Sequence, residues 1–190
     1  MNKMAIFMLL FSGILLFGCT SFPVETNKSN SYLMYNNEIY GFSMQYPKTW
    51  SLQENFYANV TLFGQNIPMN AIVVLYKPIQ NNFRTNINII VENTDLNISE
   101  YALLAKQSLP IALKFNNFIQ LNEKNLTISN NDAYFLEYAY NKEGYAIKVK
   151  QVYIIHKDRA YVITYTSLQN NFNESIDEFN EIINSFKFIN

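Results

Sequence analysis

The stretch that decides the fold spans residues 136–150 and reads LEYAYNKEGYAIKVK. On both sides of its central Asn-Lys-Glu-Gly, large apolar side chains alternate with small or charged ones, which is the pattern of strands with one buried face. Asn and Gly between two such segments are typical of a turn. We therefore expect an antiparallel β-hairpin here.

Two registers are open for this hairpin. A four-residue loop places Tyr140 opposite Tyr145 and Glu137 opposite Lys148, whereas a two-residue loop places Glu137 opposite Lys150. Both registers put opposite charges on adjacent strands, which stabilises a sheet. In either register one face of the hairpin is aliphatic and rich in tyrosine, and the other face is charged.

The hairpin is the middle of a predicted four-stranded meander over residues 118–166, with further turn signals at Asn130-Asn131 and Lys157-Asp158. If the last hairpin turns at Lys157-Asp158, the charged face continues along the final strand. An uncovered face of this kind is a candidate binding surface, because it combines lysine with tyrosine, a residue enriched at binding hot spots. Its residues are Glu137, Lys148, Lys150, Tyr161 and Tyr165.

Three further strands are predicted before the meander, over residues 40–47, 71–76 and 86–91, where apolar or β-branched side chains are flanked by Asn and Pro. The segment 61–70 carries no such pattern. We expect it to be a loop.

The first of two predicted helices begins near Asn97, whose side chain can cap the helix while Glu100 reaches back, as in a capping box. Pro110 should end or kink this helix, because it lacks a backbone donor. Four residues share one face of the helix: Tyr101, Leu104, Ala105 and Ser108.

The second predicted helix spans residues 172–184, with Asn171 as its cap and Glu174 as the capping-box partner. Apolar residues recur at steps of four and three and form a stripe that must lie on the sheet. They are Phe172, Ile176, Phe179, Ile183 and Phe186. Together the elements predict an α+β fold, an antiparallel sheet with a C-terminal meander packed against two helices.

The N-terminal residues resemble a bacterial lipoprotein signal peptide. Lys3 precedes an apolar run over residues 4–18 that ends at Gly18, and Cys19 follows. The run is shorter than the roughly 20 residues that a membrane-spanning helix needs. The resemblance implies that Cys19, the only cysteine in the chain, accepts a lipid and holds the protein on the extracytoplasmic side of the cell membrane. An ordinary buried cysteine and an uncleaved N-terminal helix remain the alternatives.

We accordingly expect a signal peptide over residues 1–18, a lipidated flexible spacer over residues 19–37 and one globular domain over residues 38–190. The spacer carries mainly Ser, Thr and Asn, with Glu25 and Lys28, a composition typical of flexible linkers. No internal repeat or second change of composition divides the remaining chain.

Composition excludes several classes of function. The net charge is −1 and no basic cluster occurs, so we expect no nucleic-acid partner. Motifs for zinc, EF-hand calcium, P-loop and dinucleotide sites are absent, so we expect no cofactor, although an oxygen-only metal site stays open. The only histidine, His156, lies at a predicted strand end and is expected to be an exposed, non-catalytic imidazole. We expect a monomer without enzymatic activity.

Two short motifs resemble the PsbP-like family. Residues 41–50 read GFSMQYPKTW, in which a strand ends in Tyr-Pro and a Trp follows, and residues 185–188 read SFKF after an amphipathic helix. The resemblance covers roughly residues 37–190. It implies an α/β/α sandwich, the fold that the PsbP and Mog proteins share, and known members mostly bind or stabilise larger assemblies.

Two functions therefore remain open from the sequence. The first is a lipid-anchored extracytoplasmic binding or accessory module with an unidentified protein partner. The alternative is a carrier of a small apolar or aromatic ligand at the cell surface, which the Tyr- and Phe-rich strands favour. A closed apolar pocket would favour the carrier.

Overall fold

The computed structural model of the chain describes residues 31–62, 65–112 and 116–189. Its elements follow one another in the order β1 (Tyr32–Asn37), β2 (Phe42–Pro47), β3 (Ser51–Leu62), β4 (Gln65–Tyr76), β5 (Asn86–Asn93), α1 (Ile98–Ala112), β6 (Asn116–Ile128), β7 (Asn131–Lys142), β8 (Tyr145–His156), β9 (Arg159–Leu168), the 3-10 helix η1 (Gln169–Glu174), α2 (Ile176–Ser185) and β10 (Lys187–Phe188).

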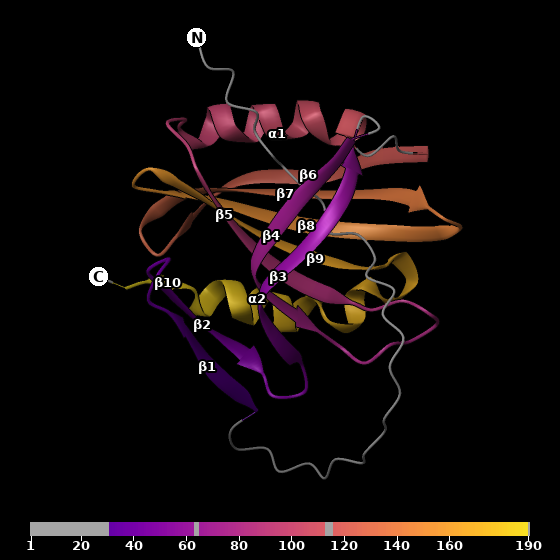
Figure 1. The fold of residues 1–190 in the computed structure, drawn as a ribbon, viewed down its shortest axis with the longest axis horizontal. Coiled ribbons are helices and arrows are strands. Elements are labelled where there is room, and N and C mark those ends of the chain that lie inside the picture. Colours follow the sequence, from indigo (N-terminus) through magenta and orange to yellow (C-terminus); the bar gives the residue numbers. More distant parts are fainter. Residues whose placement is uncertain (1–30, 63–64, 113–115, 190) are drawn as a thin grey trace.

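A seven-stranded antiparallel sheet, in the order β3-β4-β5-β9-β8-β7-β6, forms the centre of the fold. Helices α1 and α2 lie on its two sides, and a smaller sheet, β1-β2-β10, lies on the side of α2 (Figure 1). The α+β class and the meander β6 to β9 are thus as the sequence predicts.

Of the two predicted registers, the hairpin β7–β8 adopts the one with a two-residue loop. Lys142 pairs with Tyr145, and Glu137 pairs with Lys150. The loop residues Glu143 and Gly144 have φ values of 52° and 84°. Positive φ at both positions is the geometry of a type I′ turn, whose twist matches that of the flanking strands. Turn geometry therefore selects the register.

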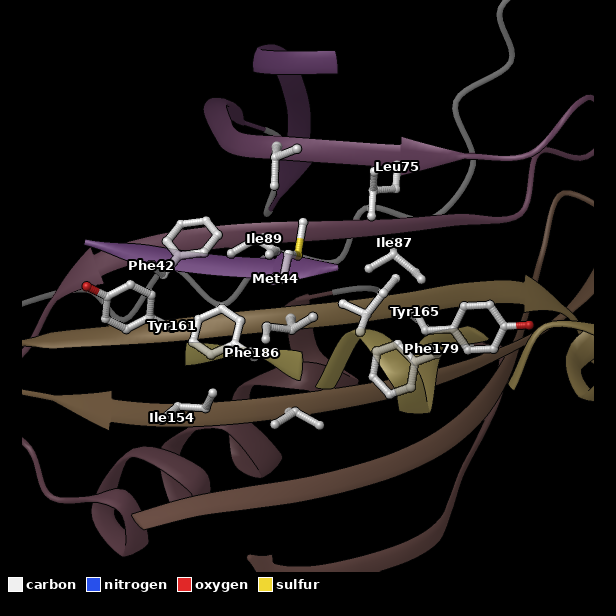
Figure 2. Packing of buried hydrophobic residues seen from close by; sticks show 14 of the residues in the cluster. Phe42, Met44, Leu75, Ile87, Ile89, Ile154, Tyr161, Tyr165, Phe179 and Phe186 are labelled. Atoms are coloured by element: carbon white, nitrogen blue, oxygen red, sulfur yellow. The ribbon is translucent and has the colours of Figure 1, made fainter. Parts of the chain in front are cut away.

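Each face of the large sheet has its own hydrophobic core. On the α1 face, buried tyrosines of β7 and β8, among them Tyr138 and Tyr153, pack against Tyr101 of α1. On the α2 face, the sheet packs against Phe179 of α2 and against Phe42 of β2 (Figure 2). The Tyr-rich face of the predicted hairpin is covered by α1, and α2 covers part of its mixed face.

Several described segments outside the predicted strands are themselves strands, including all of β3. Residues 61–62 and 65–70, from the segment expected as a loop, belong to β3 and β4, in which Thr61 pairs with Asn66 and Ala58 with Met69. Tyr32–Asn37, expected as the end of the spacer, forms β1 and pairs with β2. Both predictions were wrong because backbone hydrogen bonds to a neighbouring strand hold these segments, and side-chain patterning does not report those bonds.

The capping box of α1 is confirmed. The Asn97 side chain accepts hydrogen bonds from the backbone N–H groups of Ser99 and Glu100 at 3.0 and 3.1 Å, and the Glu100 carboxylate accepts one from the Asn97 N–H at 3.0 Å.

The predicted shared face of helix α1 was only partly right, because Leu104 is 39% exposed. Pro110 does not end the helix, which continues to Ala112. The buried residues of α1 are Tyr101, Ala102, Ala105 and Leu109.

The second helix begins later than predicted. Asn171 and Phe172 belong to η1, and α2 starts at Ile176 after Ser175. Asn171 therefore caps no α-helix, and its side chain donates to Glu174 at 3.0 Å. The apolar stripe is nevertheless correct: Phe172, Phe179 and Phe186 are fully buried, and Ile176 and Ile183 pack against the same core.

Candidate functional site

A groove lies between α2 and the strands β6 to β8, and we call it the α2 groove. Its volume is about 300 Å³, at the lower end of the roughly 300–1,000 Å³ of small-molecule sites. Its lining residues are Lys124, Leu126, Phe135, Lys150, Val152, Phe179, Asn180, Ile183 and Asn184.

The groove exists because α2 is packed on one flank only. On the flank toward β3 to β5, β2 fills the space, and the Ser185 hydroxyl accepts a hydrogen bond from the Gln45 N–H at 2.9 Å. Asn180, Ile183 and Asn184 lie on the other flank, about 100° to 180° around the helix from Ser185. Within the described ranges, no element covers the sheet between this flank and β6.

Cations and aromatic rings meet in the groove. The Lys150 ammonium lies 4.9 Å from the centre of the Phe135 ring and 5.6 Å from that of Phe179, and it donates to the Asn180 side-chain oxygen at 3.2 Å. The Lys124 ammonium lies 5.9 Å from the Phe135 ring centre. Such contacts attract cations to the ring face. Lys124 and Lys150 thus both lie against the Phe135 ring.

The charge balance around the groove is positive. Burial lowers the pKa of Lys150 below its ordinary value of 10.5; nearby Glu137 opposes this shift, while Lys124 and Lys148 add to it. Glu137 is bound to Lys148 at 2.9 Å, and the Lys148 ammonium also lies 4.3 Å from the Phe172 ring centre. Lys124, Lys148 and Lys150 thus surround the single negative charge of Glu137, and this surface is suited to an anion.

The structure separates the five residues predicted as a binding surface. Glu137, Lys148 and Lys150 lie together beside α2, but Tyr161 and Tyr165 are only 2% and 0% exposed. Their hydroxyls donate to the carbonyl oxygens of Tyr40 and Phe172, each at 2.7 Å. The prediction that these tyrosines offer a surface is wrong, because α2 and the small sheet cover this face.

Sequence reasoning missed the other residues of the groove. Phe135 and Lys124 are directly opposite each other in the β6–β7 register, and Asn180 comes from α2. A signal for Lys124 was available, because it alternates with Leu126 along β6. The position of α2 over this part of the sheet carried no sequence signal.

His156 is half-buried, not exposed as expected. Its ring stacks on Phe188 with centroids 3.9 Å apart, and its Nδ1 is 2.8 Å from the Asn131 side-chain oxygen. Burial, with Lys157 nearby, lowers the pKa of His156. It borders a second, mostly polar pocket of about 260 Å³ beside Arg159. These contacts give His156 a structural role at the C-terminal strand.

Some predictions fall outside what the structure describes or concern absences. Cys19 and the signal peptide lie outside the described residues. Among the residues that are described, no helix combines the length and apolar character needed to cross a bilayer. In that same part of the chain, no three His, Cys, Asp or Glu side chains are grouped as metal ligands would be.

The fold defines the class of protein. The chain is similar to cyanobacterial PsbP (CyanoP) from Synechocystis sp. PCC 6803, with a TM-score of 0.59, 12% identity, and coverage of 87% of this chain and 98% of that one. LpqN, involved in cell envelope biogenesis of Mycobacterium tuberculosis, is similar with a TM-score of 0.57, 14% identity, and coverage of 86% and 88%. The Saccharomyces cerevisiae Ran-binding protein Mog1p is similar with a TM-score of 0.51 and 10% identity, and the match covers 84% of this chain and 96% of that one. The PsbP/Mog-like fold that the sequence motifs imply is therefore confirmed.

The sequence also matches a family directly. Residues 47–185 match the DcrB family, and the chain belongs to it. No curated protein sequence matches the chain.

Proposed function

We propose that this protein is a non-enzymatic binding or accessory module on the extracytoplasmic side of the membrane, held there by a lipid on Cys19, with the α2 groove as its binding site. It acts as a monomer and engages no nucleic acid. The proposal draws on the lipoprotein-like N-terminus and on the DcrB-family domain.

One observation carries the choice of site. Lys150 is half-buried over Phe135 and Phe179, and its hydrogen bond in the groove goes to the neutral Asn180. Keeping a partly desolvated ammonium in a groove costs free energy unless an opposite charge compensates. An anionic partner would supply that charge.

The apolar part of the floor supports a second candidate function, a carrier of a small ligand. Phe135, Val152 and Phe179 line the groove and are almost fully buried. The groove is open to solvent on one side, as an accessory surface requires, yet it has the volume of a small-ligand site. The two functions differ in the size of the molecule bound.

Photo-crosslinking in native membranes tests the proposed site. A photoreactive residue replaces Asn184, which is exposed and lines the groove, and in a control variant replaces Glu181, which is exposed on the same helix outside the groove. We expect a discrete adduct at position 184 only. A protein-sized adduct supports the accessory module, a lipid-sized or smaller adduct supports the carrier, and equal labelling at both positions overturns the site.

The anchor has its own test. In a lipoprotein several acyl chains on one cysteine give stable membrane binding, since each buried methylene contributes about 0.8 kcal/mol. Cys19→Ala should therefore move the protein to the soluble fraction or leave an unprocessed precursor. Unchanged fractionation together with an unchanged mass would overturn the anchor.

A further inference from the structure

We infer that the α2 groove binds an anionic amphiphile, a molecule with a carboxylate or phosphate head and a short acyl or aromatic tail. The inference rests on the proposed function in taking this groove as the binding site. It adds the chemical class of the ligand and the direction in which the ligand lies.

The head group is placed by the polar end of the groove. The Lys150 ammonium and the Asn180 side chain are joined by a hydrogen bond of 3.2 Å, and Lys124 approaches the same Phe135 ring from β6. Two ammonium groups and an amide donor suit the oxygens of one carboxylate or phosphate. An anion there also relieves the repulsion between the lysines.

The tail is placed by the strand register. Along β8, Val152 follows Lys150 on the same face. In the register Lys124 lies level with Phe135 and Val152, and Leu126 lies at the next residue pair on the same face beyond them. Helix α2 runs in the same direction, because Phe179 packs beside Tyr165 while Phe186 packs beside Tyr161, and Ile183 lies between them in sequence. Lys150 and Asn180 therefore lie at one end of the groove, and Leu126 and Ile183 lie toward the other end, which matches an amphiphile.

The volume limits the part of the ligand that fits. About 300 Å³ corresponds to roughly ten water-sized volumes of about 30 Å³ each. A head group with a short chain or a single ring fills this space, and a longer tail would extend beyond it.

The experiment uses the full-length protein and four probes of eight carbons each: octanoate, octyl phosphate, octanol and octylammonium. Binding is measured by calorimetry, and amide shifts of Phe135 and Ile183 are followed by NMR. We expect both anions to bind at least about tenfold more tightly than octanol, because hydrogen bonds between charged groups are stronger than those to a neutral hydroxyl. Octylammonium should not bind. Equal binding of octanol and the anions would overturn the inference, as would shifts outside the groove.

Variants separate the head-group contact from a general effect of charge. Lys150→Met and Lys124→Met should each weaken binding of the anions by about tenfold, and Lys150→Arg should keep most of it. Lys48→Met removes an exposed lysine outside the groove and should change nothing. Loss of binding in all four variants would overturn the inference, and thermal melting shows that each variant is folded.

Two further arms separate the possible sources and the possible failures. Vesicles of phosphatidylglycerol present the anionic head group in a bilayer, so binding to octanoate but not to vesicles identifies a free ligand. If no anion binds while a partner still crosslinks at position 184, the ligand class is wrong and the proposed site stands. If anions bind in the groove but nothing crosslinks in membranes, the ligand class stands and the membrane function fails.

Discussion

The Lys150 ammonium lies 4.9 Å from the centre of the Phe135 ring. Lys150 is paired in register with Glu137, yet that carboxylate bonds to Lys148 at 2.9 Å. Lys150 is therefore held by a ring face and an amide in place of a full opposite charge. The Lys150 ammonium can therefore bind an anion in the groove beside α2.

Replacing Phe179 by alanine should lower the free energy of unfolding by about 3 to 5 kcal/mol. Phe179 is fully buried, and its ring stacks on Tyr165 with centroids 5.5 Å apart, so its loss leaves a cavity beneath α2 (Figure 2). Urea denaturation measures the change. Glu181→Ala, on the exposed side of the same helix, should stay within about 0.5 kcal/mol. Equal losses in the two variants would mean that the buried face of α2 is assigned wrongly.

Replacing Asn97 by alanine should destabilise the protein by about 1 kcal/mol. The variant removes the acceptor for two backbone N–H groups at the start of α1. Asn97→Asp keeps an oxygen acceptor and adds a charge that favours a helix N-terminus, so its stability should match the natural protein. The prediction fails if the Ala and Asp variants unfold at the same urea concentration.

Gly144→Ala should destabilise the protein by about 1 to 2 kcal/mol. The cause is backbone conformation alone, because φ is +84° and an added Cβ would meet nothing within 4 Å. Asparagine tolerates positive φ better than alanine, so Gly144→Asn should cost less. Thermal melting of the two variants decides, and a more stable alanine variant would contradict the type I′ turn.

Tyr165 should make stability depend on alkaline pH. Burial raises its pKa from the ordinary value of 10.0 to about 12. The folded state holds this proton more tightly than the unfolded state, so the contribution is fully present below pH 10 and is lost as pH rises through about 12. Unfolding free energies between these limits, with Tyr165→Phe as the comparison, measure the slope. The phenylalanine variant should show a shallower decline, and identical slopes would contradict the assignment.

The sequence by itself determined the elements whose signals are local. The alternation in residues 136–150, the Asn97 capping box and the apolar stripe through Phe179 each depend on neighbours a few residues apart, and the structure confirms all three. The order of the meander follows from its turns, since short loops join adjacent antiparallel strands. The Tyr-Pro and Trp motif predicted the fold shared with PsbP and Mog proteins.

Tertiary structure alone decided what depends on distant partners. Tyr32–Asn37, at the end of the predicted spacer, became a strand because β2 supplies its backbone hydrogen bonds. Tyr161 and Tyr165 became core because α2 and the small sheet cover their face, although the same alternation would suit a solvated face. The α2 groove joins Lys124, Phe135, Lys150 and Asn180 from β6, β7, β8 and α2, and a site assembled across four elements depends on how they pack, which no local pattern encodes.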